Sequence, residues 1–171
     1  PDGTISKYKA RYCVRGDLQE NVQETFAPVV AWSTVRLFLV LSLTLNWKTC
    51  TIYFSSAFVQ APLSDPVWIH LPRGFHSPRG HATCLRLLKS LYGLSVAPRL
   101  WYQYLPEALR EEGFKACAND PCLLYKDTIM VVLYVDDLGI AYSNENDLKK
   151  LFSNLESKGL NFTREGTFTD F

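Results

Sequence analysis

Residues 129–143 (IMVVLYVDDLGIAYS) place two adjacent carboxylates, Asp136 and Asp137, in the middle of an apolar, β-branched and aromatic run. Charge inside a buried strand is costly, so the run predicts two strands, residues 130–135 and 138–142, with the aspartates at the tip of a two-residue hairpin. Such turns normally contain glycine or asparagine, because their residues need positive φ. A tip without glycine favours a functional role, and an acidic surface turn is the alternative. Two carboxylates on a rigid tip suit Mg²⁺ that also contacts substrate phosphates.

The whole chain has the composition of a soluble globular domain. Of its 171 residues 47% are hydrophobic and 20% are charged, and the formal net charge is +1. The absence of an initial methionine and of a closing element predicts a piece of a longer polypeptide. Five cysteines without zinc-site spacing predict free thiols in a reducing compartment. Residues 35–45 are apolar but too short to cross a bilayer, so no membrane partner is expected.

Two segments contain basic residues and no acidic ones, which suits a polyanionic partner, although solvated surface charge is the alternative. The basic residues are Lys7, Lys9, Arg11 and Arg15 within residues 5–16, and Arg73, Arg79, Arg86, Lys89 and Arg99 within residues 66–101.

Hydrophobic periodicity predicts an α+β fold, an antiparallel sheet with helices packed on one side. Residues 8–14 alternate cationic and apolar side chains, as in a strand with one solvated face. The predicted helices cover residues 34–45 with Ser33 as N-cap, residues 98–112 with Gly113 as the stop, and residues 146–157. Further strands are predicted at residues 48–54, 67–71, 83–89 and 122–125.

The YVDD hairpin resembles the catalytic hairpin of reverse transcriptases, and six further blocks are similar to the Ty1/copia-type retrotransposon polymerases. The seven blocks keep the order and approximate spacing of that family. They are KARYCVRGD (9–17), ETFAPVVAWSTVR (24–36), SSAFVQAPL (55–63), VWIHLPRGF (67–75), LRLLKSLYGLSVAPRLWY (85–102), GFKACANDPCLLY (113–125) and YVDD (134–137).

The resemblance implies a partial reverse transcriptase domain over residues 1–171. Fingers with palm crossings are expected at about 1–50 and 64–101, and palm at about 51–63 and 102–171, while thumb and RNase H are lacking. The implied activity is RNA-directed DNA polymerisation with two Mg²⁺ ions, Mn²⁺ being possible. The implied partners are an RNA or DNA template with its primer, deoxynucleoside triphosphates and the remainder of the Pol polyprotein, in cytoplasmic virus-like particles.

The resemblance also implies roles for individual residues. Asp136 is the firmer metal ligand and Asp137 its neighbour. Lys9 and Arg11 contact the triphosphate, unless they are solvated strand charges. Phe58 crowds the sugar 2′ position, unless it is core. Arg73 lies beside the incoming nucleotide, unless it is a loop-surface cation. The positive charges of Arg86, Lys89 and Arg99 separately predict electrostatic contacts with the backbone of the primer–template.

One position departs from the family pattern. The third catalytic carboxylate stands four residues before the Ala-Phe pair, here Ala57-Phe58, and that position is Tyr53. A phenol is neutral at pH 7 and is a poor Mg²⁺ ligand. We therefore hypothesise that this copy is catalytically impaired, through element decay or a sequencing error. The alternatives are an inactive palm that still binds primer–template and a decayed relic that does not fold.

Overall fold

A computed structural model describes residues 4–5, 8–19, 24–72, 74–76, 80 and 84–166. The helices are η1 (Gly16–Leu18), α1 (Trp32–Thr44), η2 (Ala57–Gln60), α2 (Ala97–Glu111) and α3 (Glu145–Ser157), of which η1 and η2 are short 3₁₀ turns. The strands are β1 (Lys48–Tyr53), β2 (Trp68–His70), β3 (Cys84–Arg86), β4 (Lys115–Ala116), β5 (Leu123–Lys126), β6 (Ile129–Tyr134), β7 (Asp137–Tyr142) and β8 (Thr163–Arg164).

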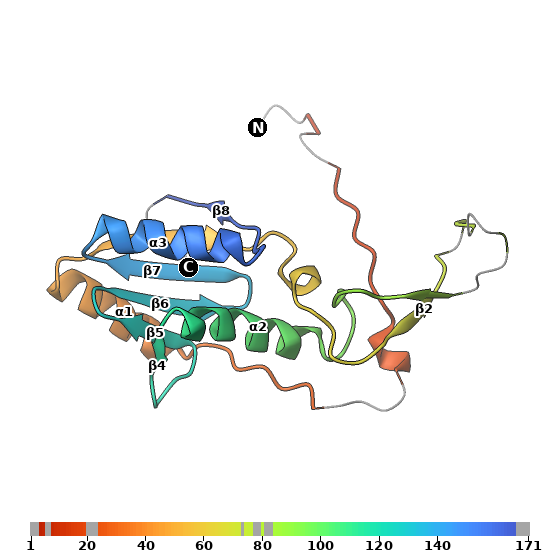
Figure 1. Cartoon of the computed structure of the whole chain (residues 1–171), viewed down its shortest axis with the longest axis horizontal. Coiled ribbons are helices and arrows are strands. Elements are labelled where there is room, and N and C mark those ends of the chain that lie inside the picture. Colours follow the sequence, from red (N-terminus) through yellow and green to blue (C-terminus); the bar gives the residue numbers. More distant parts are fainter. Residues whose placement is uncertain are drawn as a thin grey trace.

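Six of these strands form one antiparallel sheet in the order β4-β5-β6-β7-β1-β8, and β2 and β3 form a separate two-stranded ribbon (Figure 1). The hairpin strands β6 and β7 lie in the middle of the sheet. Every β6 residue except Tyr134, and every β7 residue except Asp137, is buried. The predicted α+β class with an antiparallel sheet is therefore confirmed.

Helices cover both faces of this sheet. Figure 1 shows α2 and α3 in front of the strands and α1 behind them. Side chains alternate between the two faces of a strand, so an apolar strand such as β6 can be buried throughout only if both faces are covered. The prediction that the helices pack on one side is wrong for this reason: α1, whose Val35 and Phe38 are buried, contacts β6 and β7 from behind the sheet (Figure 1).

Local signals explain where two of the helices end or begin. Gly113 has φ +89° and donates its N–H to the Arg110 carbonyl at 2.8 Å, so it ends α2 as predicted. Asn144 caps α3, because its side-chain oxygen accepts the Asn146 N–H at 2.9 Å. The predicted Ser33 cap is wrong, since Ser33 lies inside α1.

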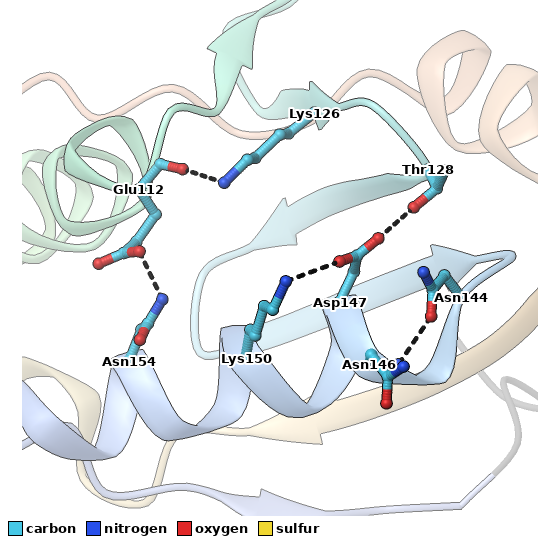
Figure 2. Close-up of polar contacts among 8 residues, drawn as sticks. All are labelled: Glu112, Lys126, Thr128, Asn144, Asn146, Asp147, Lys150 and Asn154. Atoms are coloured by element: carbon cyan, nitrogen blue, oxygen red, sulfur yellow. Dashed lines mark hydrogen bonds and ion pairs between the residues drawn. The ribbon is translucent and has the colours of Figure 1, made fainter.

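A polar network fixes α3 to the neighbouring elements (Figure 2). The Thr128 hydroxyl donates to the Asp147 carboxylate at 2.6 Å, and Asn154 donates to the Glu112 side chain at the end of α2. Lys126 donates to the Glu112 carbonyl, which lies at the negative end of the α2 dipole. These bonds hold α2, α3 and the β5–β6 turn in one arrangement.

The buried carboxylate of Asp120 joins the start of α1 to the β4–β5 connection. Its two oxygens accept the Ala31 N–H at 3.0 Å and the Cys122 N–H at 2.9 Å, and the residue is 7% exposed. Burial alone would raise the pKa of Asp120. Hydrogen bonds from Thr34, Ala31 and Cys122 outweigh burial and lower this pKa below its ordinary value.

We predict that Asp120→Asn lowers the free energy of unfolding at pH 7 by about 2–3 kcal/mol, because one of the two carboxylate oxygens that accept backbone N–H groups is replaced by an NH2 donor. Because the native pKa of Asp120 is lowered, its carboxylate stabilises the fold above the unfolded pKa of about 4. This stabilisation is lost as the pH falls through the native pKa. In urea unfolding, the difference in unfolding free energy between the unchanged chain and Asp120→Asn should therefore become smaller in acid.

The matched control is Asp17→Asn, which removes an exposed carboxylate paired with Arg15. We expect no measurable change from it. Equal losses in the two variants would contradict the role of Asp120.

Candidate active site

The end of strand β1 and the β6–β7 hairpin meet at one place. Tyr53 pairs with Asp137 across the β1–β7 ladder, and the next residue, Phe54, donates its N–H to the Asp136 carbonyl at 2.8 Å. Burial raises the pKa of Tyr53, and the Asp136 charge, the nearby Tyr92 and a hydrogen bond to Asp136 raise it further. The phenol therefore lies within side-chain reach of Asp136. The hypothesis that Tyr53 occupies the position of a third carboxylate requires this proximity.

The hairpin turn is shifted by one residue from the prediction. Tyr134 pairs with Asp137, so the two turn residues are Val135 and Asp136, and Asp137 is the first residue of β7. Val135 has φ +54°. The left-handed region is unfavourable for a β-branched residue, and such strain costs about 1–3 kcal/mol.

Trp101 supports this strained turn from α2. Its indole N–H donates to the Val135 carbonyl at 2.6 Å, and its ring centroid lies 5.1 Å from that of Phe54. Trp101 is 2% exposed, so its position is fixed by the core. Trp101 and Phe54 thus hold the backbone on either side of Asp136.

Negative charge accumulates at the hairpin. Burial raises the pKa of Asp137, and the charges of Asp136 and of Glu165, just after β8, raise it further. A bound cation would relieve this repulsion. Within the described residues, however, no three His, Cys, Asp or Glu side chains are grouped to hold a metal ion. The donor set fits one cation held by Asp136 and Asp137, and it does not fit a cage that needs a third carboxylate.

A cavity of about 370 Å³ opens beside Tyr53. The predicted triphosphate contacts Lys9 and Arg11 both line it, and Tyr92 lies at its wall. The lining is completed by Ala10, Tyr12, Ser55, Ser56, Val59 and Leu91. Two cations from the N-terminal segment and the Tyr53 phenol therefore share one opening.

The N-terminal segment reaches this cavity without forming a strand. Residues 8–14 are outside any strand or helix, so the strand prediction there is wrong. The segment is held instead by a bond from the Val14 N–H to the Tyr92 carbonyl at 2.8 Å. A Cβ on Gly93, which has φ +88°, would lie 2.0 Å from the Val14 carbonyl oxygen, and a Cβ on Gly16 would lie 2.0 Å from the Gly93 oxygen. Both glycines are needed for this close backbone contact.

None of the other predicted site residues that the structure describes lines this cavity. Phe58 is half-buried behind the cavity, with its ring centroid 5.1 Å from that of Tyr92, and it does not line the opening. Arg99 is paired with the Glu24 carboxylate at 3.0 Å. Arg86 and Lys89 are exposed on or after strand β3. Arg73 lies outside the described residues.

Sequence reasoning missed several contributors to the site: Glu165, Gly16, Gly93, and the hydrogen bond from Trp101. The only usable signal in the sequence was the preference of glycines in loops for positive φ.

The described helices include none long and apolar enough to cross a membrane.

Comparison with known proteins identifies the family of the chain. The family model described as reverse transcriptase (RNA-dependent DNA polymerase) matches residues 2–164. The chain is 32% identical over 165 residues to the retrovirus-related Pol polyprotein from transposon RE1 of Arabidopsis thaliana, covering 92% of the chain and 11% of that protein. It is 31% identical over 163 residues to that from transposon TNT 1-94 of Nicotiana tabacum, covering 90% and 12%.

A more distant similarity reaches yeast. The transposon Ty1-ER2 Gag-Pol polyprotein of Saccharomyces cerevisiae is 28% identical over 163 residues, covering 92% of the chain and 9% of that protein. The chain thus spans about a tenth of the length of these curated relatives. Its matched residues, its hairpin and its relatives agree: the chain belongs to the reverse transcriptase (RNA-dependent DNA polymerase) family, as a partial domain of the Ty1/copia type.

Proposed function

We propose that the chain is the fingers-and-palm portion of an RNA-directed DNA polymerase whose nucleotidyl transfer is impaired in this copy by Tyr53. The observation that carries the proposal is the β1–β7 register, which sets Tyr53 opposite Asp137 and beside Asp136. In this assignment the six-stranded sheet is the palm, and the N-terminal segment with the β2–β3 ribbon belongs to the fingers.

The cavity supplies the nucleotide site in this proposal. Lys9 and Arg11 bind the phosphates of a deoxynucleoside triphosphate, while the hairpin carboxylates lie next to Tyr53, which also lines the cavity. Phosphoryl transfer depends on such positioning and charge neutralisation rather than on covalent help from the protein. Primer–template and the remainder of the polyprotein complete the assembly.

Asp136 and Asp137 would hold Mg²⁺, which when bound neutralises charge on the transferred phosphate. Tyr53 contributes a neutral hydroxyl where a bridging carboxylate is required, and its raised pKa keeps the phenol protonated. The chain's own residues can therefore bind and orient a nucleotide. They do not complete the two-ion cage that the reaction uses.

A second function is favoured by one observation. Lys9 and Arg11 line the cavity, whereas Asp136 and Asp137 are not among its lining residues. A palm that binds primer–template without copying it would keep these electrostatic, salt-dependent contacts. Salt-sensitive duplex binding by this chain, together with no nucleotide incorporation, would favour this function over polymerisation.

We predict that Tyr53→Asp, in a protein restored to full length, increases primer extension on an RNA template at least about 10²-fold, because misplacement of reacting groups by about 1 Å costs that much. The measurement is extension of a labelled primer with Mg²⁺ and, separately, Mn²⁺.

Two controls separate the carboxylate from other effects of the change. Tyr53→Phe removes the hydroxyl without adding a charge and should remain as inactive as the unchanged protein. Asp136→Asn in the Tyr53→Asp background should abolish the gain. Equal, robust extension by the unchanged protein and Tyr53→Asp would refute the impairment.

A second prediction concerns metal-dependent stability. Tyr53→Asp adds a third negative charge beside Asp136 and Asp137, so we expect it to lower the Tm by a few degrees in EDTA. Excess Mg²⁺ should reverse this loss, by about 2.7 kcal/mol when the ion is at 100 times its Kd. Thermal unfolding of the 171-residue chain measures both effects.

The matched control is Glu165→Gln, which removes a charge that acts on Asp137 from the edge strand. It should raise the Tm slightly in EDTA and leave the Mg²⁺ response of Tyr53→Asp intact. The same Mg²⁺ shift with Tyr53 and with Asp at this position would show that the third carboxylate is not a ligand.

A further inference from the structure

We propose, resting on the function above, that Tyr92 is a positioning residue that presents the Arg11 guanidinium to the phosphates of a bound nucleoside triphosphate. The guanidinium carbon of Arg11 lies 4.2 Å from the centroid of the Tyr92 ring. A cation over an aromatic face within about 6 Å is attracted by the negative charge of that face.

Arg11 needs such a platform because little else fixes it. It lies on an exposed segment without regular secondary structure, and within the described part of the chain it makes no ion pair with a carboxylate. A free arginine side chain loses considerable rotamer entropy when it binds a ligand. Stacking on a ring orders the side chain before the ligand arrives, so less entropy is lost when the ligand binds.

Tyr92 itself is rigidly held. The ring of Phe58 packs against it with the two planes 51° apart, and Phe58 in turn contacts both hydrophobic clusters of the molecule. The carbonyl of Tyr92 accepts the Val14 N–H, three residues beyond Arg11. Platform and cation are therefore joined twice, once through the backbone and once through the side chains.

The stack is at the right place to serve a ligand. Tyr92, Arg11 and Lys9 line the same cavity as Tyr53, and Tyr92 lies near enough to Tyr53 to influence it electrostatically. A ligand in this cavity meets two cations on the side of the N-terminal segment. Planar guanidinium groups bind phosphate oxygens through two parallel hydrogen bonds, which requires a defined orientation. The ring face supplies that orientation.

The test is a double-mutant cycle on dTTP binding, measured by titration calorimetry with the 171-residue chain. Tyr92→Phe keeps the ring face and should bind within about twofold of the unchanged chain, whereas Tyr92→Leu should weaken binding about 3- to 10-fold. Arg11→Gln should weaken binding at least as much. In the Arg11→Gln background, Tyr92→Leu should have no further effect.

A second measurement reads the contact itself. In NMR spectra the Arg11 side-chain protons should be shifted upfield by the ring, in the unchanged chain and in Tyr92→Phe, and this shift should vanish in Tyr92→Leu. Tyr104→Leu removes another half-buried tyrosine, which packs on Trp101, and serves as the control for general loss of packing. It should change neither readout.

The outcomes distinguish the two proposals. A loss from Tyr92→Leu that persists in the Arg11→Gln background, or the absence of an upfield shift at Arg11, would overturn the positioning role alone. No binding of dTTP to the unchanged chain, with the upfield shift present, would overturn the nucleotide site and the positioning role with it.

Discussion

The antiparallel pairing of β1 with β7 is the constraint on which the site depends. Side chains of a strand alternate between faces, so a slip of one residue would turn Tyr53 away from the hairpin carboxylates. Six consecutive residue pairs, ending with Tyr53 and Asp137, fix this register. The bond from Phe54 to the Asp136 carbonyl extends the pairing into the turn. The position of residue 53 beside the hairpin is therefore defined by backbone bonds, whichever side chain it carries.

The surrounding fold stores strain at the turn and compensates for it nearby. Val135 occupies a backbone region that suits glycine, and the buried Trp101 holds its carbonyl. Below the hairpin, both faces of β6 and β7 are covered by helices, one of which is tied to the sheet by Asp120. A hairpin whose strands are buried and whose tip is open to solvent is suited to holding two carboxylates close together against their repulsion. Tyr53 is accommodated in this scaffold without a break in the β1–β7 ladder.

The sequence predicts the elements that carry strong local signals. The apolar hairpin, the helix that Gly113 ends and the approach of Tyr53 to Asp136 were all predictable, from periodicity and from family resemblance. The turn was misplaced by one residue because pairing register depends on contacts across the sheet. Residues 8–14 alternate like a strand but pair with no strand among the described residues, and a backbone contact at Gly93 holds them instead. The charge of Glu165 and the ring of Tyr92 reach the site only through tertiary structure, so no local pattern indicates them.

The central claim is that a phenol stands in the place of the third carboxylate of a cation-binding site. Electron paramagnetic resonance of Mn²⁺ tests this claim most directly, by counting the ions bound per chain with dTTP present. The account predicts at most one tightly bound ion in the unchanged chain and a second in Tyr53→Asp, because the second ion lacks a carboxylate ligand while residue 53 is a tyrosine. Two tightly bound ions with Tyr53 in place would contradict it.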